Sequence, residues 1–363
     1  MNDVTPAEFA QLFSQETPLI DVRAPVEYEQ GRLPGAMNLF LMNDQERAAV
    51  GTAYKKQGRE AAIALGHDLV SGDLREQRIE LWSEHIRRHP DAVIYCFRGG
   101  LRSKTTQQWL AGRGIHRPLI EGGYKKARQY LRNEIEKFSV SQPLLMLSGA
   151  TGSAKTHLLR RTTGFYPSLD LEKYACHRGS AFGSLPQGQP TQIDFEHQIA
   201  VQILKIGTTQ AKILVEDESR LIGRCAIPEE FFLKMRASPL LYLDVPLDQR
   251  VENIYQDYIL ATAIGGVDST QALVQFQVYR NAMGQISKKL GGARAQELMK
   301  DLDFSQKQYL SDPSQTESNK LWIKKLLLFY YDPFYTSSLN RRSPEILVRG
   351  SAETIFDYLR SQL

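Results

Sequence analysis

The stretch PLLMLSGATGSAKTHLLRR, residues 143–161, constrains the fold of this chain more than any other. An apolar run ends at a glycine-containing loop, and a segment of helix-forming residues follows directly. This order predicts a buried strand, a turn and a helix whose N-terminal N–H groups face the turn, the arrangement that binds phosphate in parallel α/β proteins. The apolar runs at 211–219 and 239–246 predict further buried strands. The second half of the chain is therefore expected to contain an α/β domain.

The loop fits the phosphate-binding pattern G-x-x-x-x-G-K-[ST] at Gly149, Lys155 and Thr156, whereas Ala154 stands in place of the second glycine. We expect its backbone amides and Lys155 to hold phosphate groups, with Thr156 as the magnesium ligand where the reaction uses that ion. The predicted set is Gly149, Thr151, Gly152, Ser153, Lys155 and Thr156. A plain strand-to-helix turn is the alternative, and the alanine argues against nucleotide hydrolysis.

Charged residues near this loop are further candidates. Glu216 and Asp217 end the strand in VEDES, where P-loop enzymes hold magnesium or a catalytic water, although such residues also cap helices. Arg178 in HRGS and Arg224 in ESRLIGR carry positive charge in expected loops, which makes them candidates for phosphate contacts. The stretch 329–342 interleaves tyrosines with arginines, which suits either a packed core or stacking on bases.

A second glycine loop follows the apolar run in VIYCFRGGLRS, residues 93–103. Cys96 ends the predicted strand, and Arg98, Gly99, Gly100 and Arg102 lead into a predicted helix. Backbone amides and arginines around a thiol favour a reactive thiolate in a site that also holds anions. Sulfur transfer and phosphate hydrolysis both remain open, since the spacing from Cys96 to Arg102 also fits cysteine phosphatases. The structural alternative is a buried core cysteine.

The alternation of strands and helices predicts an α/β fold in two domains. Strands at 18–22 and 92–96 flank a helical region at 44–88, and the polar stretch before Pro143 marks the boundary. We predict a parallel-sheet domain over 1–138 and a P-loop α/β domain over 139–363, with an α-helical part beyond 247.

Composition limits the cellular compartment and the kinds of binding site that we expect for this chain. The three cysteines are far apart, which argues against a disulfide framework or a structural zinc site and predicts a reducing cytoplasm. No apolar run is long enough to cross a membrane, and the first residues do not resemble a signal peptide. The net charge of +4 means that any nucleic-acid site must be a local patch.

The motif DVRAPVEYEQGRLPGAMNL, residues 21–39, together with Cys96 to Arg102 resembles the rhodanese family, in which a strand-end cysteine carries sulfur as a persulfide. Gly31-Arg32 departs from the usual Gly-His of that turn. The stretches VGTAYKKQG, ALGHDLVSG, IEGGYKKAR, HRGSAFG, VEDESRLIG and YYDPFY are absent from ordinary rhodaneses. With the P-loop, they resemble the tRNA 2-selenouridine synthase family over essentially the whole chain, Ala154 being the departure in the P-loop.

This resemblance implies a transferase acting on the wobble 2-thiouridine of tRNAs for glutamate, glutamine and lysine. The thiouridine sulfur would be geranylated from geranyl diphosphate, and selenium from selenophosphate would then replace the S-geranyl group. Cys96 would receive or present selenium, Gly149 to Thr156 would hold the diphosphate, and Arg178 and Arg224 would contact the diphosphate or the tRNA. A selenophosphate-supplying enzyme is an expected partner, and no tightly bound cofactor is implied.

Two other functions remain open from the residues. One is a sulfurtransferase or cysteine-phosphatase domain fused to a small-molecule P-loop kinase, which predicts ATP turnover without tRNA affinity. The other is a sulfide- or phosphate-sensing module coupled to a P-loop regulator. Neither alternative requires the additional motifs.

Overall fold

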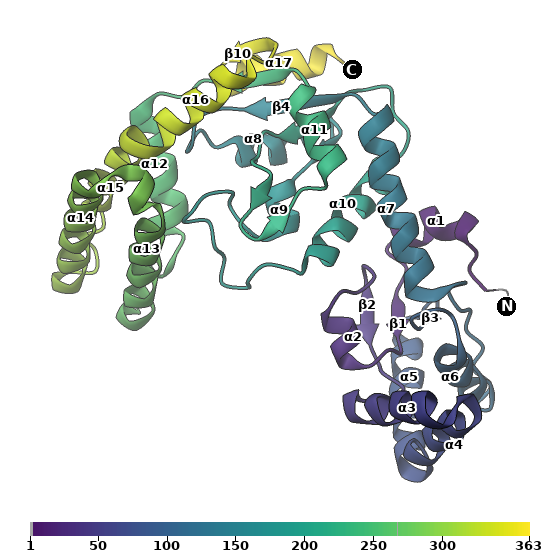
Figure 1. Cartoon of the computed structure of the whole chain (residues 1–363). Coiled ribbons are helices and arrows are strands. Elements are labelled where there is room, and N and C mark those ends of the chain that lie inside the picture. Colours follow the sequence, from purple (N-terminus) through teal and green to yellow (C-terminus); the bar gives the residue numbers. More distant parts are fainter. Residues whose placement is uncertain (1–2, 267) are drawn as a thin grey trace. The chain divides into compact units, whose positions relative to one another are not determined.

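The computed structural model describes residues 3–266 and 268–363, which group into two compact units (Figure 1). Unit 1 comprises the residues up to Phe138 together with Pro190–Thr208, and unit 2 comprises Ser139–Gln189 and Thr209–Leu363. A single division of the sequence after residue 138 would assign 190–208 to the second half, whereas its contacts group it with unit 1. Both units are built on parallel sheets with helical connections, so the predicted α/β fold is confirmed.

The sheet of unit 1 has three parallel strands in the order β2-β1-β3. They are β1 (Leu19–Asp21), β2 (Ala36–Asn38) and β3 (Val93–Tyr95). The strands predicted at 18–22 and 92–96 are confirmed. Two isolated parallel bridges extend the pairing beside this sheet, in which Leu119 pairs with Ile94 and Ile120 with Val4.

Helices connect and cover this sheet because parallel strands need crossover connections. In order along the chain, the helices of unit 1 are η1 (Pro6–Glu8), α1 (Phe9–Ser14), α2 (Pro25–Glu29), α3 (Asp44–Gln57), α4 (Arg59–Leu69), α5 (Gly72–Arg88), α6 (Leu101–Ala111), α7 (Gly123–Ser141) and α10 (Gln192–Ile206). Helices α3, α4 and α5 form the insertion between β2 and β3. Trp82 of α5 ties this insertion to the core, because its indole N–H donates to the carbonyl of Leu39 at 2.8 Å.

Helix α10 packs against α1 and the loop after α2, although it lies far along the sequence. A Cβ at Gly31 would come within 2.7 Å of the Ile193 side chain, so the glycine permits this contact. The Nδ1–H of buried His197 donates to the carbonyl of Arg32 at 2.7 Å, and the carboxylate of Asp194 accepts from the Arg32 N–H at 2.9 Å. Burial lowers the pKa of His197 to about 4, which keeps the imidazole neutral.

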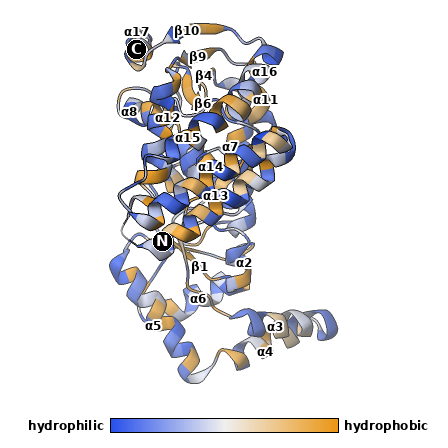
Figure 2. Ribbon diagram, turned by 90° about the vertical axis from the view of Figure 1, so that its left-hand side faces the viewer, coloured by the Kyte–Doolittle hydropathy of each residue, from blue (hydrophilic) through white to orange (hydrophobic). Residues whose placement is uncertain are grey.

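The sheet of unit 2 has five parallel strands in the order β10-β9-β4-β6-β5. They are β4 (Leu144–Ser148), β5 (Ser168–Leu169), β6 (Ile213–Glu216), β9 (Leu240–Leu243) and β10 (Ile346–Gly350). The chain runs from β4 to β5 on one side of β4 and later from β6 to β9 on its other side, so the loop after β4 lies at the switch point where ligands bind in such sheets. Figure 2 shows β4, β6 and β9 largely in the hydrophobic colour.

The helices of unit 2 are α8 (Lys155–Thr162), α9 (Leu171–Ala175), α11 (Glu229–Ala237), α12 (Leu247–Tyr255), η2 (Gln256–Leu260), η3 (Ala263–Gly265), α13 (Ser269–Leu290), α14 (Gly292–Ser311), α15 (Asn319–Leu326), η4 (Leu327–Tyr331), α16 (Asp332–Arg342) and α17 (Ala352–Ser361). The short strands β7 (Leu221–Ile222) and β8 (Cys225–Ala226) form a hairpin. The predicted helical C-terminal part is confirmed, and its own core includes Phe276, Tyr279, Tyr309 and Trp322. After α16 the chain returns to the sheet as β10, which the sequence pattern did not predict.

Within residues 3–266 and 268–363, no helix has both the length and the apolar character that crossing a membrane requires.

Candidate active sites in the two units

Cys96 lies directly after β3, at the start of the loop that leads into α6. Its Sγ accepts a hydrogen bond from the Gly100 N–H at 3.2 Å and lies 3.2 Å from the hydroxyl oxygen of Ser103. Since Gly100 is the N-terminal cap of α6, the sulfur faces the N-terminal end of the helix. This placement stabilises negative charge at the sulfur or at a group bound to it.

The turn before α7 supports the cysteine loop from behind. The Tyr124 N–H donates to the Cys96 carbonyl at 2.9 Å, and the Lys125 N–H donates to the Phe97 carbonyl at 3.0 Å. Gly123 has a φ of +61°, and a Cβ there would lie 2.4 Å from the Cys96 carbonyl oxygen. Only glycine fits this position, which explains the need for a glycine in the GGY stretch beside the loop.

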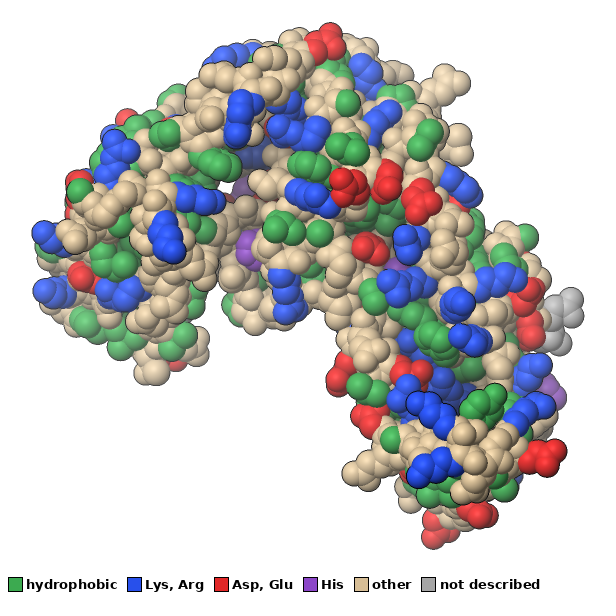
Figure 3. All heavy atoms as spheres, in the orientation of Figure 1, with side chains coloured by type: hydrophobic (Ala, Val, Ile, Leu, Met, Phe, Trp, Pro, Cys, Tyr) green, Lys and Arg blue, Asp and Glu red, His purple; other side chains and the backbone are tan. Residues whose placement is uncertain are grey.

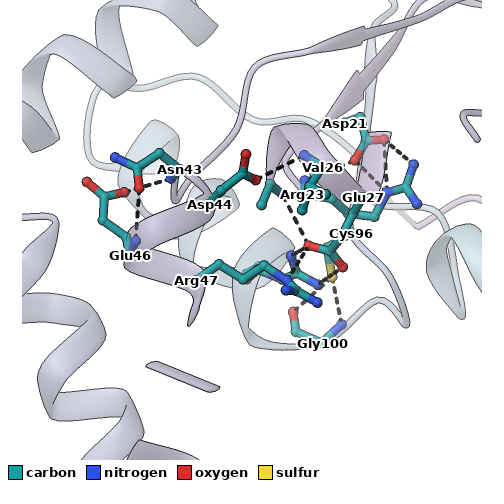
Figure 4. Close-up of polar contacts among 12 residues, drawn as sticks. Asp21, Arg23, Val26, Glu27, Asn43, Asp44, Glu46, Arg47, Cys96 and Gly100 are labelled. Atoms are coloured by element: carbon teal, nitrogen blue, oxygen red, sulfur yellow. Dashed lines mark hydrogen bonds and ion pairs between the residues drawn. The ribbon is translucent and has the colours of Figure 1, made fainter. Parts of the chain in front are cut away.

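The arginines of the cysteine loop differ in their partners. The guanidinium of Arg102 donates to the Glu27 carboxylate at 2.5 and 3.1 Å. Arg47 of α3 pairs with the same carboxylate at 3.2 Å (Figure 4). These contacts hold α2, α3 and α6 together around the thiol. Arg98 instead lies beside the ring of Phe97, with 5.8 Å between its guanidinium carbon and the ring centroid.

A buried ion pair lies beneath this site. Arg23 pairs with Asp21 at 2.6 Å, and the hydroxyl of Tyr95 donates to the same carboxylate at 2.8 Å. The guanidinium of Arg23 also lies 3.9 Å from the centroid of the Tyr124 ring. Burial and the negative charge of Asp21 raise the pKa of Tyr95 well above its usual value, so its hydroxyl keeps its proton. The Asp-Val-Arg motif thus fixes the ends of β1 and β3.

Cys96 opens into a cavity of about 1040 Å³ within unit 1. The other predicted residues in its lining are Arg98, Gly100 and Arg102, while Gly99 packs against the backbone of Gly122 instead. The walls also carry cationic side chains that sequence reasoning did not assign to this site: Arg23, Arg47, Lys55, Arg59 and Arg128. Figure 3 shows Lys and Arg side chains gathered over α3 on the visible face.

The P-loop lies between β4 and α8, as predicted. The Lys155 ammonium donates to the Gly149 carbonyl at 2.9 Å, which holds the side chain across the loop. Ala154 has φ 60° and ψ 36°, the left-handed conformation that glycine adopts without strain. The alanine therefore adopts a turn conformation that suits glycine, at a conformational cost. Ser153 is buried, and its hydroxyl has no hydrogen-bond partner among residues 3–266 and 268–363.

Carboxylates gather beside Lys155 and Thr156. The Thr156 hydroxyl donates to the Glu172 carboxylate at 2.7 Å. Burial and the nearby charge of Glu172 raise the pKa of Glu218 to about 8 and that of Glu216 well above its usual value. Gly179 has a φ of +61°, and a Cβ there would lie 2.6 Å from a Glu218 oxygen, so the HRGS glycine lets its loop approach these acids.

This cluster of carboxylates lies where a magnesium ion was predicted, beside Thr156. Glu216 is fully buried, and in the described part of the chain neither of its carboxylate oxygens has a hydrogen-bond partner. A bound cation would stabilise the ionised form of these acids, although the described side chains include no group of three or more Asp, Glu, His or Cys residues arranged to hold a metal. Magnesium commonly takes one or two protein ligands and completes its shell with water and substrate phosphate, so Thr156 and Glu172 fit that role.

Asp217 is engaged in a structural ion pair. Arg342 of α16 donates to one carboxylate oxygen at 2.7 Å, and the Ser148 hydroxyl donates to the other at 2.6 Å. The aromatic and basic stretch at 329–342 therefore supplies a buried partner for the residue after β6. This interaction joins two segments that sequence reasoning treated separately.

The P-loop lines a cavity of about 480 Å³ within unit 2. Its lining includes the predicted residues Gly149, Thr151, Gly152, Lys155, Thr156, Arg178 and Asp217. The lining also includes an aromatic wall of apolar and aromatic side chains, formed by Phe182, Tyr258, Trp322, Ile323, Leu326, Leu327, Tyr330, Tyr331 and Phe334. A site of this shape suits a ligand with a charged phosphate end and an apolar body.

Three predicted residues lie outside the lining of this cavity. Ser153 is buried, and so is Glu216 of β6. Arg224 lies between β7 and β8, where its N–H donates to the side-chain oxygen of Gln189 at 2.8 Å. Arg178 does line the cavity and donates to the Asp257 carbonyl at 2.6 Å. The aromatic wall was not predicted, because its members are dispersed over many segments.

Comparisons with known proteins match this pair of units. The Rhodanese-like domain model matches residues 5–130, and the model described as the tRNA 2-selenouridine synthase AAA domain matches residues 142–363. Proteins named tRNA 2-selenouridine synthase are similar over nearly the full length. The one from Nitrosomonas eutropha is 47% identical, covering 98% of this chain and 97% of the relative.

Two further relatives carry the same name. That from Bdellovibrio bacteriovorus is 49% identical over 97% of this chain and 96% of the relative. That from Nitrosomonas europaea is 46% identical over 99% of both chains. Identity at this level over the whole length, with both domain models in the same order, shows that the chain belongs to the tRNA 2-selenouridine synthase family.

Proposed function

We propose that this chain converts wobble 2-thiouridine in tRNA to 2-selenouridine, by way of an S-geranyl intermediate made from geranyl diphosphate. The relatives named tRNA 2-selenouridine synthase support the overall conversion. The observation that carries the geranyl step is the P-loop cavity, whose lining combines phosphate-binding residues with an apolar and aromatic wall. A kinase site for a small polar substrate has no need of that wall.

The P-loop residues bind and orient the prenyl donor in this proposal. The loop amides and Lys155 hold the diphosphate, and the aromatic wall holds the geranyl chain. Magnesium, when bound at Thr156 and Glu172, supplies further charge neutralisation for the leaving diphosphate. The thiouridine sulfur takes the geranyl carbon as the diphosphate leaves. Alkylation turns a poor leaving group into a good one, which opens the ring carbon to a selenium nucleophile.

The cysteine cavity serves the second step. The Cys96 loop presents selenophosphate, and the Gly100 N–H and the surrounding arginines stabilise the negative charge of this ion. The selenium of selenophosphate bonds to the ring carbon as the geranylthiolate leaves. Water then cleaves the P–Se bond, which releases phosphate and leaves 2-selenouridine. We propose tRNAs for glutamate, glutamine and lysine as substrates, and an enzyme that supplies selenophosphate as a partner. The cytoplasmic location predicted from the three cysteines stays a prediction.

The test is nucleoside analysis of 2-thiouridine-containing tRNA incubated with the purified protein. With both co-substrates, we expect 2-selenouridine, and without selenophosphate we expect S-geranyl-2-thiouridine. Omission of geranyl diphosphate should prevent both products. Formation of 2-selenouridine at the full rate without geranyl diphosphate would exclude the geranyl route. ATP turnover without any change in the tRNA would instead support a kinase.

A further inference from the structure

The cavity at Cys96 is much larger than a selenium donor the size of phosphate requires. Its volume of about 1040 Å³ reaches the upper end of the range of about 300–1,000 Å³ that is usual for small-molecule sites. We propose that this cavity binds the S-geranylated wobble nucleotide, with the geranyl chain against helices α3 and α4 and the nucleotide phosphates against the surrounding cations. This inference rests on the proposed function and assigns the intermediate its binding site.

The insertion between β2 and β3 supplies the apolar wall. Seven apolar side chains of α3, α4 and the segments before and after them line the cavity: Leu41, Met42, Ala48, Val50, Ala62, Ile63 and Val70. Transfer of a hydrocarbon chain from water to such a wall is favourable in proportion to the area buried. A selenophosphate ion gains nothing from these residues. The wall therefore indicates a second ligand with a sizeable apolar part.

The charges of the lining identify the other part of that ligand. Seven cationic side chains surround the cavity: Arg23, Arg47, Lys55, Arg59, Arg98, Arg102 and Arg128. Glu27 is the one carboxylate among the lining residues, and Arg47 and Arg102 both pair with it. Arg23 is buried and paired with Asp21. The other four cations, Lys55, Arg59, Arg98 and Arg128, come from several elements, so they suit successive phosphates of a nucleic-acid backbone.

Exposed aromatic side chains complete the match to a nucleotide. Phe97 of the cysteine loop is 37% exposed, and Tyr54 of α3 is 60% exposed, although both line the cavity. Large exposed rings next to cationic groups are the usual platforms for bases that are splayed out of an RNA loop. A wobble base turned into this cavity would meet the rings, the apolar wall and Cys96.

Gly51 leaves additional space in the cavity. It lies in the interior of α3, where glycine is less favourable than alanine, and it lines the cavity. A Cβ built at Gly51 would meet no atom within 4 Å, so packing within the protein does not require the glycine. The open space beside it is where a larger side chain would compete with a bound prenyl group.

Recognition of the geranyl chain by the Cys96 cavity would set the order of the two reaction steps. If the cavity recognises the geranyl chain, the unprenylated 2-thiouridine binds weakly beside Cys96 and the prenylated form binds well. The selenium step then selects nucleotides that have already acquired a good leaving group. The α3–α4 insertion would be the specificity element for that selection.

The test measures binding of synthetic anticodon stem-loop RNAs that carry either 2-thiouridine or S-geranyl-2-thiouridine at the wobble position. For the unmodified protein, we expect the geranylated RNA to bind at least about tenfold more tightly. Gly51→Leu should remove most of this preference, and S-geranyl nucleoside should accumulate as 2-selenouridine falls. Ala49→Leu adds the same side chain to an exposed position of α3 outside the cavity lining and should leave both measurements unchanged.

Two controls keep the outcomes separate. Leucine is a better helix former than glycine, so the unfolding temperature of the Gly51→Leu protein should not fall, and a loss of binding then reflects the cavity. Equal binding of the two RNAs by a protein that still makes 2-selenouridine would overturn this inference and leave the proposed function intact. Absence of 2-selenouridine from the unmodified protein would overturn the proposed function first.

Free geranyl diphosphate also combines a geranyl chain with phosphate groups, so it is the alternative ligand for the Cys96 cavity. A competition experiment distinguishes it from the geranylated RNA. The competition uses the Lys155→Ala protein, whose P-loop is disabled. We expect that added geranyl diphosphate does not displace the geranylated RNA from this protein. Displacement of the RNA at concentrations that saturate the P-loop of the unmodified protein would show that the Cys96 cavity takes the diphosphate itself, and would overturn the assignment.

Discussion

The hydroxyl of Tyr335 in α16 accepts a hydrogen bond from the backbone N–H of Gly149 at 2.9 Å. The same hydroxyl lies 2.5 Å from the Ser148 oxygen, and it donates there because the Ser148 proton is directed at Asp217. Arg342 holds the far side of Asp217. The helical C-terminal part is therefore connected to the first residue of the P-loop by a continuous chain of hydrogen bonds.

Removal of this hydroxyl should destabilise unit 2. Tyr335→Phe leaves the Gly149 N–H without its acceptor and Ser148 without a donor, so we expect the free energy of unfolding to fall by about 1–3 kcal/mol. Urea unfolding measures the change. Tyr358→Phe in α17 removes the same atom away from the loop and should change stability by less than about 0.5 kcal/mol. Equal effects of the two substitutions would contradict the role of the hydrogen-bond chain.

Ala154 should be a position where glycine is the better residue. Its left-handed conformation costs an alanine about 1–2 kcal/mol, and Ala154→Gly removes this cost while increasing the freedom of the unfolded chain. We expect a net gain in the free energy of unfolding of about 0.5–1 kcal/mol. Ala49→Gly, in the exposed interior of α3, is the matched control and should lose a similar amount. A loss of stability at both positions would show that the turn is not strained.

Glu218, a half-buried carboxylate beside the P-loop, predicts how stability changes with pH. The pKa of Glu218 is raised to about 8 in the folded protein from 4.5, so folding favours the protonated form. Its stabilising contribution is complete below the unfolded pKa and is lost as the pH rises through the folded pKa. We expect Glu218→Gln to flatten the decline in stability between pH 4.5 and 8 and to make the protein more stable than the unmodified form at pH 8.

The measurement compares chemical unfolding of the two proteins across this pH range. His197 has the opposite sign, because its lowered pKa gives stability that is lost as the pH falls towards about 4. Subtraction of the two curves cancels that contribution, which both proteins share. Glu230→Gln, an exposed residue of α11, should leave the curve unchanged. A Glu218→Gln curve parallel to that of the unmodified protein would refute the assigned charge coupling.

His197 should stabilise unit 1 although it lies in the second half of the sequence. His197→Ala removes the donor to the Arg32 carbonyl from a fully packed interface, and we expect a loss of about 2 kcal/mol in the free energy of unfolding. Hydrogen exchange should show the loss in unit 1, including α1 and the loop after α2. His116→Ala, an exposed residue, provides the comparison, and an equal change there would refute the packing of α10.

Local patterns were sufficient to predict the sheet cores and both glycine loops. Strands β1, β3, β4, β6 and β9 are buried apolar runs, which a short window of sequence reveals. Strands β2 and β10 are partly exposed, so their hydrophobic pattern is too weak to distinguish them from loops. Helix α10 is amphipathic, but no local pattern indicates which unit covers its apolar face.

Prediction of the two candidate sites was limited in the same way, because local patterns reveal only residues that lie in short motifs. Cys96 and Lys155 were found because each stands in a short motif whose geometry is local. Tyr335 and the aromatic wall of the P-loop cavity come from segments that only the fold brings together. The role of Asp217 was similarly hidden, since its partner Arg342 lies more than a hundred residues away in the sequence.

The central claim is that the two cavities perform separate half-reactions, and two substitutions test it most directly. The measurement is mass spectrometry of nucleosides from tRNA incubated with both co-substrates. We predict that Cys96→Ala abolishes 2-selenouridine and accumulates S-geranyl-2-thiouridine, whereas Lys155→Ala prevents geranylation. Cys176→Ser and Lys173→Ala are matched controls outside both cavity linings. Normal 2-selenouridine from the Cys96→Ala protein would contradict the account.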